Sequence, residues 1–598
     1  MSTRLPTGGR LIDRSKHLSF SFNGVQYQGY EGDTLASALL ANGEVLVGRS
    51  FKYHRPRGIV SAGAEEPNAL MNLGEGARFE PNQRATTTKL FAGLTARSQN
   101  HWPSLKYDIG VLNNLMSPLF SAGFYYKTFI HPRVAWKHVF EPVIRQSAGL
   151  GAAPTEPDPD TYEHYYATVD VLVVGGGVAG LGAAQEAVDA GARVLVLEQG
   201  ESWGGRTPVD GGEISGQAPE AWVEERVASL AEQGAQLRLR TMAAGVYDHG
   251  YVLAYERIAD DTPGDGRPRH RLWRIRAGKV VTATGAIERP LSFAGNDVPG
   301  VMLASAVRDY LYLYGVACGD STVVVTNNDD GYRTALALLQ AGCKVPALLD
   351  ARPDHDSALV KEARAVGLRL LFGMGVKKVE GKQVVQGVVV APMDGAGAFE
   401  TIACDCVAMS GGWSPVVHLW SHCGGKLTWD APHAMFKPDP NRPPIGADGS
   451  GFVITGGAAS GALHASEALK DGARAGREAA EALGFKTKTG TFPTITGVED
   501  ETPMQPVWLM PQGADYPLRA KSFLDFQNDV KVSDVQLAAK EGFESVEHTK
   551  RYTTLGMATD QGKLSNINGL AILADALGKP IPQVGTTTFR PPYTPISM

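Results

Sequence analysis

One stretch of the sequence, VDVLVVGGGVAGLGAAQEAVDAGARVLVLEQG at residues 169–200, constrains the fold of this chain more than any other. A run of β-branched residues is followed by three glycines, by a segment with helical periodicity and by a second apolar run. That order predicts a strand, a tight turn, a helix and another strand, which is the unit of parallel sheets covered by helices. The chain is therefore expected to contain an α/β domain of the doubly wound, Rossmann-like type.

The glycines between strand and helix match the pattern G-x-G-x-x-G at Gly175, Gly177 and Gly180. The first permits the turn, the second lets the backbone approach a pyrophosphate, and the third lets helix and strand pack closely. Glu198 follows 23 residues after Gly175, at the end of the second strand. A carboxylate there accepts hydrogen bonds from ribose hydroxyls and repels a 2′-phosphate, which favours NAD or FAD over NADP.

The residues expected around this dinucleotide lie in three parts of the sequence. The pyrophosphate, the ribose and the adjoining turn are assigned to Gly175, Gly177, Val178, Ala179, Gly180, Glu198, Gln199, Gly205 and Arg206. Val246 is at the place where this fold usually contacts the adenine. At the other end of the cofactor we expect Gly457, Ala458 and Leu463. Ordinary core packing explains Val246 and Leu463 equally well.

Later α/β segments, including ATGAIERP at residues 283–290 and ITGGAASG at 454–461, extend the pattern. The layout resembles the two-dinucleotide-binding-domain flavoproteins, whose late motif carries an aspartate for the flavin ribityl chain. Gly457 takes that place here, so the carboxylate is missing. The inserted second unit reads VVVTNNDDGYRTA at residues 323–335, without the glycines that admit a second pyrophosphate. The resemblance therefore implies one dinucleotide site beside a second unit that binds none.

At 598 residues the chain is too long for one core and should form about three to five domains. Residues 17–43 predict a hairpin that turns at Asn23-Gly24, followed by a helix that begins near Asp33, as in a ferredoxin-like β-grasp domain. DCVAMSGGWSP at residues 405–415 is expected to return the chain to the first Rossmann-like unit. The expected domains are a β-grasp domain without a cluster (1–95), an extended arm and linker (96–166), an NAD-binding Rossmann-like domain (167–300 and 401–485), an inserted second Rossmann-like domain (301–400), a small helical domain (515–580) and a C-terminal tail (581–598).

Composition narrows the class of protein. The formal net charge of −6 gives no reason to expect nucleic-acid binding. The sequence shows no signal peptide and no run of about 18 apolar residues, so we expect a cytoplasmic protein without a membrane span. The five cysteines lack paired spacing, which suits a reducing compartment, and Cys404 and Cys406 are expected to be buried on one face of a strand. No spacing indicates a catalytic triad or a metal site, and we assign His418 and His422 to packing.

Two places in the sequence have the spacing of an iron–sulfur site but not its thiolates. The C-x4-C-x2-C spacing of plant-type ferredoxins falls on Ser61, Glu66 and Ala69, here called the first cluster position. A small helical domain of the bacterioferritin-associated ferredoxin type has C-x-C and later C-x4-C. That spacing falls on Asp525, Gln527, Asp560 and Ser565, here called the second cluster position. Oxygen ligands do not replace four thiolates, so neither position is expected to hold a cluster.

Five segments together resemble the alpha subunits of heterotetrameric sarcosine oxidases, and the resemblance runs from about His17 to the C-terminus. They read RSFKYHRPRG at residues 49–58, EEPNAL at 65–70, LDFQNDV at 524–530, KRYTTLGMATDQGK at 550–563 and VGTTTFRPPYTP at 584–595. In that family a further domain of the aminomethyltransferase type binds tetrahydrofolate. This chain is expected to end before that domain, so folate would be bound only by a domain absent from it.

The resemblance implies an enzyme, a flavin-dependent oxidase of CH–NH donors assembled from alpha, beta, gamma and delta subunits. It would demethylate sarcosine to glycine with O2, giving H2O2 and formaldehyde or 5,10-methylenetetrahydrofolate. FAD on the beta subunit would oxidise sarcosine, FMN at the alpha–beta boundary would reduce oxygen, and this chain would hold NAD that is not turned over. The alternatives are a stand-alone FAD-dependent, NADH-linked oxidoreductase and a non-catalytic scaffold subunit of an opine or amine oxidase.

Two basic segments have no assigned role in the dinucleotide site. The loop at residues 49–57 is either a solvated basic face or a contact with an acidic partner or a flavin phosphate. In the segment HTKRYTT, at residues 548–554, an FMN could take the place of the missing cluster. Its candidate FMN or interface residues are Lys550, Arg551, Thr553 and Thr554.

Overall fold

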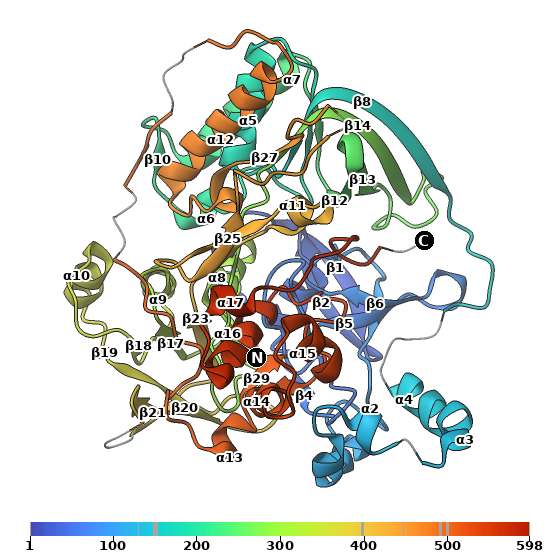
Figure 1. Cartoon of the computed structure of the whole chain (residues 1–598), viewed down its shortest axis with the longest axis vertical. Coiled ribbons are helices and arrows are strands. Elements are labelled where there is room, and N and C mark those ends of the chain that lie inside the picture. The colour runs from blue at the N-terminus through green and yellow to red at the C-terminus, as the bar shows by residue number, and fades with distance from the viewer. Residues whose placement is uncertain are drawn as a thin grey trace. The chain divides into compact units, whose positions relative to one another are not determined.

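The computed structural model describes residues 2–129, 131–147, 153–395, 400–446, 448–488, 493–497 and 502–596 (Figure 1). Part of the expected linker, residues 148–152, lies outside the described residues. The chain forms two compact units. The first compact unit comprises Met1–Pro159, Glu288–Gly412 and Glu501–Thr587, and the second comprises Asp160–Ile287, Trp413–Asp500 and Thr588–Met598.

The second compact unit is built on a seven-stranded sheet whose order is β11-β9-β8-β14-β13-β12, with β27 paired to β14. The strands β11, β9, β8, β14 and β27 are parallel, as the strand–turn–helix–strand sequence predicts, and β12 to β14 are antiparallel. The strands are β8 (Tyr162–Val174), β9 (Val194–Leu197), β11 (Gln236–Arg238), β12 (Thr241–Tyr247), β13 (Tyr251–Arg257), β14 (His270–Thr282) and β27 (Val453–Thr455). Smaller elements are α6 (Thr207–Asp210), β10 (Glu213–Ile214), α7 (Pro219–Glu232), η4 (Asp248–Gly250), α11 (His418–His422), β25 (Leu427–Asp430), β26 (Met435–Pro438), η6 (Gly457–Ser460) and β28 (Ile495–Thr496).

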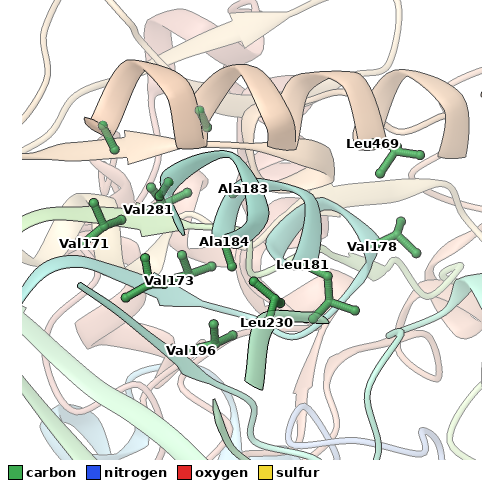
Figure 2. Close-up of a cluster of buried hydrophobic side chains, with 14 of the residues drawn as sticks. Val171, Val173, Val178, Leu181, Ala183, Ala184, Val196, Leu230, Val281 and Leu469 are labelled. Atoms are coloured by element: carbon green, nitrogen blue, oxygen red, sulfur yellow. The ribbon is translucent and has the colours of Figure 1, made fainter. Parts of the chain in front are cut away.

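Two helices, α5 (Val178–Asp189) and α12 (Ala465–Glu481), lie side by side against this sheet (Figures 1 and 2). Their backbones approach closely because α12 carries glycines at the contact. A Cβ atom at Gly472 would lie 2.2 Å from the carbonyl oxygen of Ala179, and one at Gly476 would lie 2.1 Å from that of Ala183. Around this contact the core contains fully buried side chains that include Val171, Val173, Leu181, Val196 and Leu469.

The first compact unit begins with a five-stranded sheet of order β2-β1-β7-β5-β6, which agrees with the predicted hairpin and helix. The hairpin turns at Asn23-Gly24, where both residues have positive φ, as a two-residue type I′ turn requires. Thr34 caps the following helix through a reciprocal capping box with Ser37. The elements are β1 (Asp13–Phe22), β2 (Val25–Glu31), α1 (Leu35–Ala41), β3 (Gly48–Arg49), β4 (Pro56–Arg57), β5 (Leu70–Leu73), η1 (Gly76–Arg78), β6 (Glu80–Arg84) and β7 (Thr95–Arg97).

A second, parallel sheet of order β16-β23-β17-β18-β19 and the antiparallel strands β20-β21-β22 form the middle of this unit. The expectation that residues 405–415 return to the first Rossmann-like unit is wrong for β23, which pairs with β16 and β17, and the chain returns to the second compact unit only at Trp413. Cys404 and Cys406 are buried, as predicted, but only Cys406 lies in a strand, because Cys404 lies between β22 and β23. The elements are β16 (Val301–Leu303), α8 (Ala304–Asp309), η5 (Tyr310–Tyr314), β17 (Thr322–Thr326), α9 (Asp330–Gln340), β18 (Leu348–Asp350), α10 (Ala358–Ala365), β19 (Leu370–Phe372), β20 (Met374–Glu380), β21 (Gly387–Pro392), β22 (Glu400–Ala403) and β23 (Cys406–Ser410). Two further short strands pair with each other, β15 (Ala286–Glu288) and β24 (Trp413–Pro415), and β24 belongs to the second compact unit.

The expected arm packs on the C-terminal helical segment of the same unit: the backbone N–H of Gly123 donates to the carbonyl oxygen of Tyr552 at 3.2 Å. The arm contains η2 (Ile109–Phe120), α2 (Phe124–Lys127), α3 (Arg133–Ala135), η3 (Trp136–Phe140) and α4 (Glu141–Ser147). The helical segment contains α13 (Tyr516–Arg519), β29 (Phe523–Asp525), β30 (Val530–Lys531), α14 (Val532–Lys540), α15 (Val546–Thr553), α16 (Asn566–Leu577) and α17 (Ile581–Val584). Among the described residues, no helix combines the length and apolar character needed to cross a membrane.

Candidate dinucleotide site

The three glycines between β8 and α5 have distinct surroundings. A Cβ atom at Gly175, whose φ is +110°, would lie 2.2 Å from the carbonyl oxygen of Ala283, and one at Gly180 would lie 1.9 Å from that of Gly175. At Gly177 the nearest atom to a Cβ would be the Cα of Gly205, at 3.9 Å. The first and third glycines therefore close the turn, whereas the second leaves the backbone approachable from outside.

The first turn of α5 supplies the donors for an anion. The first intrahelical bond runs from the N–H of Leu181 to the carbonyl oxygen of Gly177, at 2.9 Å. The N–H groups of Val178, Ala179 and Gly180 precede it and have no acceptor within the helix. Together with the positive end of the helix dipole, they fit a pyrophosphate.

Glu198 is held beside the glycine turn by backbone donors. Its Oε2 accepts a hydrogen bond of 2.7 Å from the N–H of Gly176, and its Oε1 accepts one of 2.7 Å from the N–H of Gly200. Burial raises the pKa of Glu198, and these backbone hydrogen bonds oppose the rise. A carboxylate has about four acceptor positions, so lone pairs remain for ribose hydroxyls.

The turn after Glu198 packs on the glycine turn. The N–H of Gly204 donates to the carbonyl oxygen of Gly176 at 2.9 Å, and a Cβ at Gly205 would lie 3.0 Å from the Cα of Gly177. Arg206 is directed elsewhere: it forms an ion pair of 3.1 Å with Asp210 and lies 5.1 Å from the ring centroid of Trp413. The side chain of Gln199 is exposed.

The candidate residues near Gly457 and the candidate Val246 differ in their position relative to the glycine turn. A Cβ at Gly457, whose φ is +67°, would lie 2.5 Å from the Cβ of Ala179, so η6 lies against the start of α5 and leaves no room for a larger side chain. Ala458 and Leu463, in and after η6, are half-buried. Val246 is fully buried in β12, opposite Val252, so its side chain belongs to the core.

Asp471, in α12, stabilises the turn of η6. Asp471 Oδ2 accepts from the N–H of Gly457 at 2.9 Å and from the hydroxyl of Ser460 at 2.5 Å. Its other oxygen accepts from Arg474 at 2.7 Å. Asp471 thus fixes the η6 turn, and it does not substitute for the aspartate that is missing at position 457.

In the inserted unit, the start of α9 is occupied by groups of the chain itself. Asp329 accepts hydrogen bonds from the N–H and the hydroxyl of Thr502, at 2.9 and 3.0 Å, and pairs with Arg352 at 2.7 Å. These contacts hold the pKa of Asp329 below its usual value although burial opposes them. Asp350, at the end of β18, accepts from Tyr332 and from Arg352. A second pyrophosphate would meet these carboxylates rather than free N–H groups.

The first cluster position is organised around Glu66, which is completely buried. Its Oε2 accepts from the N–H groups of Val60 and Ser61 at 2.9 and 2.7 Å, and its Oε1 accepts from those of Asn68 and Ala69 at 2.8 and 3.0 Å. Burial raises the pKa of Glu66, and the four backbone donors act in the opposite direction. One carboxylate thus satisfies four N–H groups of the loop. The sequence pattern identified Glu66 only as a position that lacks a cysteine. The signal that could have revealed its role is an acidic residue at the second of the three positions of the C-x4-C-x2-C spacing.

The second cluster position is also buried, and it is polar. Asp525 accepts from the N–H groups of Asn528 and Gly556, both at 2.7 Å, and Gln527 accepts from the N–H of Asp560 at 3.2 Å. Three of the four residues of the position are therefore brought together. Burial, followed by the nearby Asp560, raises the pKa of Asp525 to about 7. No group of three or more metal-ligating side chains occurs among the residues that the structure describes.

The basic loop at residues 49–57 is buried. Arg49 donates to the carbonyl oxygen of Leu105 at 2.7 Å, and His54 contacts Asp108 at 2.7 Å. Four of its cations are at most 9% exposed, namely Arg49, Lys52, Arg55 and Arg57. The predicted solvated face is therefore wrong, and a contact with a partner or a flavin phosphate does not fit these buried side chains either.

Two arginines of this loop bind the C-terminal helical segment. Arg55 forms an ion pair with the fully buried Asp529, and its guanidinium also lies 3.3 Å from Asp297. Arg57 donates to the carbonyl oxygen of Gln527 at 2.5 Å. The basic loop at residues 49–57 thus binds the segment that carries the second cluster position.

The four candidate FMN residues lie at the end of α15, and they do not fit a phosphate equally. The hydroxyls of Thr553 and Thr554 donate to the carbonyl oxygens of Thr549 and Thr553, at 2.7 and 2.5 Å. The end of a helix also carries partial negative charge, which disfavours an anion. Lys550 is half-buried, and the exposed Arg551 pairs with Glu547 at 3.2 Å. Of the four, the two cations therefore fit a phosphate better than the threonines.

Three parts of the chain match known families. Residues 15–101 match the family described as 2Fe-2S iron-sulfur cluster binding domain, residues 169–431 match pyridine nucleotide-disulphide oxidoreductase, and residues 519–598 match the sarcosine oxidase A3 domain. The fold is similar to that of L-proline dehydrogenase from P. horikoshii, with a TM-score of 0.69 and 20% identity, covering 100% of this chain and 99% of that one. The fold is thus that of a multidomain α/β protein, and its segment 169–431 is similar to the pyridine nucleotide-disulphide oxidoreductases, a class of dinucleotide-binding proteins.

The chain is a homologue of the alpha subunit of sarcosine oxidase, so the resemblance seen in the sequence is confirmed. It is 47% identical over 602 residues to that subunit from Rhizobium meliloti (strain 1021), covering 100% of this chain and 58% of the relative. The corresponding subunit from Corynebacterium sp. (strain P-1) is 38% identical over 606 residues, with 98% and 56% covered. An opine oxidase subunit of Rhizobium meliloti (strain 1021) is 24% identical over 72% of this chain and 97% of that protein. The chain spans less than two thirds of the length of the sarcosine oxidase subunits that it matches.

Proposed function

We propose that this chain is the dinucleotide-binding part of the alpha subunit of a heterotetrameric sarcosine oxidase, with NAD as its resident dinucleotide. The observation that carries the proposal is the geometry around Gly177, where the backbone is open to a pyrophosphate beside the half-buried carboxylate of Glu198. An adenosine ribose at Glu198 would replace no existing salt bridge, since the carboxylate accepts from the backbone N–H groups of Gly176 and Gly200.

In this assembly the chain's own residues bind and orient the dinucleotide. The N–H groups at the start of α5 would hold the pyrophosphate, and Glu198 would accept from the ribose. A bound NAD supplies a nicotinamide, which is the group that accepts or donates hydride in dehydrogenases. Asp329, at the start of α9, already binds Thr502 and Arg352. The proposal therefore includes no second dinucleotide at this position.

The proposed complex contains beta, gamma and delta subunits, and its supporting observation is that the relatives are themselves named as one subunit of an oxidase. FAD would lie on the beta subunit. FMN would lie at the alpha–beta boundary, with Lys550 and Arg551 of this chain as the groups that fit its phosphate. Sarcosine would be oxidised to glycine with O2 as acceptor, giving H2O2 and formaldehyde or, where tetrahydrofolate is bound by a further domain, 5,10-methylenetetrahydrofolate.

The residues at both cluster positions support a proposal without iron–sulfur clusters. The sequence of the segment matched as a 2Fe-2S domain contains no cysteine, since Cys318 is the first cysteine of the chain. At the second position oxygen and amide groups replace the thiolates that such clusters require. We therefore propose that electrons do not pass through these two positions.

A test is to identify the nucleotides that the chain carries. The chain is purified alone and after co-expression with the beta, gamma and delta subunits, and the released nucleotides are identified by mass and visible spectrum. We expect NAD from the chain alone and flavin only from the complex. Stoichiometric FAD on the lone chain, bleached by NADH, would show instead a stand-alone reductase.

The surroundings of Gly457 argue against a stand-alone FAD-dependent reductase. In that alternative an aspartate at position 457 would hold the ribityl chain of FAD, but a side chain there would meet Ala179. The second dinucleotide position would also have to admit NADH next to Asp329 and Asp350. No observation on this chain favours the scaffold role in an opine oxidase over the sarcosine oxidase subunit.

A further inference from the structure

The arm at residues 102–143 exposes an unusual amount of apolar surface. Of the 22 large hydrophobic side chains that are exposed among the described residues, 11 lie in these 42 residues of the 598. Leu115 is 80% exposed, Val134 75% and Tyr107 71%. Isolated exposed apolar residues need no explanation, but a concentration of this kind marks an interaction surface. We call the exposed apolar side chains of residues 102–143 the arm surface.

The arm surface belongs to a folded element. Four phenylalanine rings pack together in this element: the ring centroids of Phe120 and Phe124 are 5.7 Å apart, those of Phe124 and Phe129 are 5.9 Å apart, and those of Phe129 and Phe140 are 5.2 Å apart. A Cβ at Gly123 would lie 2.2 Å from the ring of Tyr552, so α2 is seated on the C-terminal helical segment. In Figure 1 this element is the light-blue group of α2, α3 and α4. The phenylalanines of the arm thus have partners within the unit, whereas the side chains of the arm surface are exposed to solvent.

The exposed charges of the arm itself, residues 102–143, are cationic. Lys106, Arg133 and Lys137 are exposed, as are His131 and His138. Residues 102–143 contain two carboxylates, of which Asp108 is buried against His54, and Glu141 is half-buried. The fourth cation, Lys127, pairs with Glu541. An occupant of complementary chemistry therefore has an apolar patch rimmed by Asp and Glu.

We propose that the arm surface binds another subunit of the proposed oxidase complex through an apolar patch with an acidic rim. This inference rests on the proposed function, because it takes the occupant from the proposed assembly. Aromatic side chains and Arg are enriched at protein interfaces, and the arm exposes Trp102, Tyr107 and Trp136 together with Arg133. A second copy of this chain is disfavoured, because a two-fold contact through the same face would bring its cations against themselves.

The experiment compares assembly of variants with the beta, gamma and delta subunits. The double variant Leu112→Asp/Leu115→Asp places two negative charges among the exposed apolar side chains. The double variant Arg133→Glu/Lys137→Glu (the rim variant) reverses the charge of two exposed cations of the arm. The matched control is Val366→Asp/Val384→Asp, which changes two exposed valines elsewhere in the same compact unit. The beta, gamma and delta subunits, each tagged in turn, capture the chain, and the affinity for each subunit is measured at low and high salt. NAD content and the thermal midpoint of each lone chain report folding.

We expect the leucine variant to bind at least tenfold more weakly and the rim variant to lose the salt dependence of binding, while the control and the NAD content stay unchanged. As a second measurement, amide exchange within residues 102–143 of the wild-type chain should slow on assembly. If the wild-type chain assembles, and both arm variants assemble equally well without protection of the arm, the docking proposal is overturned and the proposed function stands. Failure of the wild-type chain to assemble with any of the three subunits overturns both.

Two other occupants give distinct results. A dimer of the lone chain that Leu112→Asp/Leu115→Asp dissociates would identify a second copy as the occupant and overturn the proposal. Salt-sensitive co-sedimentation with vesicles of anionic phosphatidylglycerol, lost in both arm variants, would identify a lipid surface and overturn it as well.

Discussion

Arg84 donates a hydrogen bond of 2.6 Å to the carbonyl oxygen of Thr559, and its Nε lies 3.3 Å from the carbonyl oxygen of Glu66. One arginine therefore joins the segments that carry the first and the second cluster positions. Both places are filled by polar groups of the chain itself, and both lie in the first compact unit. The residues at the two positions therefore stabilise the first compact unit, and their replacement should change its free energy of unfolding.

Replacement of Glu66 by Ala should destabilise the first compact unit. Four buried N–H groups lose their acceptor, and even partial hydration leaves a cost of at least about 3 kcal/mol. The measurement is urea unfolding followed by a probe in the N-terminal sheet. The control is Glu65→Ala, whose carboxylate accepts a single backbone hydrogen bond of 3.2 Å at the neighbouring position and should cost less than about 1 kcal/mol. Equal stability of the two variants would contradict the structural role of Glu66.

The local parts of the fold follow from the sequence, because their signals are short-range. The hairpin at Asn23-Gly24 and the unit from β8 to β9 depend on turn chemistry and periodicity within about 30 residues. The sequence places the strand β23 in the wrong sheet, because a strand that is apolar on both faces fits any parallel sheet equally well.

The interactions at long range do not follow from the sequence. Arg55 and Asp529 are 474 residues apart, and no spacing rule connects them. A basic loop has the same composition whether water or a buried carboxylate surrounds it. For the dinucleotide site, the turn and Glu198 are predictable from spacing. The direction of Arg206 toward Asp210 and Trp413 depends on elements that fold separately.

Arg55→Ala should weaken the attachment of the C-terminal helical segment. The change leaves Asp529 completely buried without its closest cation, and loss of one partner of a buried pair costs about 3–5 kcal/mol. Limited proteolysis and urea unfolding measure the effect, and NAD content should be unaffected because the site lies in the other compact unit. Arg97→Ala breaks an exposed ion pair with Glu75 and should cost below about 1 kcal/mol. A similar small loss for Arg55→Ala would show that the pair contributes nothing.

The second cluster position should make stability depend on pH in two opposite directions. The pKa of Asp525 is raised to about 7, so the folded state holds more protons than the unfolded state between the ordinary Asp value and 7, and stability falls as pH rises through that window. Burial, followed by Arg84, lowers the pKa of Lys563 to about 7. Between 7 and the ordinary Lys value the unfolded state holds more protons, so stability rises with pH. The two effects together predict a minimum near pH 7.

Two variants separate these contributions. Asp525→Asn should remove about 4 kcal/mol of the decrease in unfolding free energy that occurs as pH rises to 7, because the pKa shift is about three units. Lys563→Met should remove a similar amount of the increase that occurs above pH 7. Unfolding by urea at a series of pH values gives both slopes. Unchanged slopes in both variants would place the titrating groups elsewhere.

Gly177→Ala should remove the dinucleotide without unfolding the chain. The added Cβ meets only the Cα of Gly205 at 3.9 Å, and Gly177 has a negative φ of −70°, so the apoprotein accepts the methyl group. A pyrophosphate that needs close approach to this backbone would be displaced, and NAD retention should fall at least tenfold. Gly180→Ala is the contrasting variant, because its Cβ would lie 1.9 Å from the carbonyl oxygen of Gly175 and must disturb the fold itself. Isothermal titration with NAD, together with the thermal midpoint without NAD, distinguishes the two. Full NAD affinity in a folded Gly177→Ala chain would mean that the pyrophosphate does not lie over this turn.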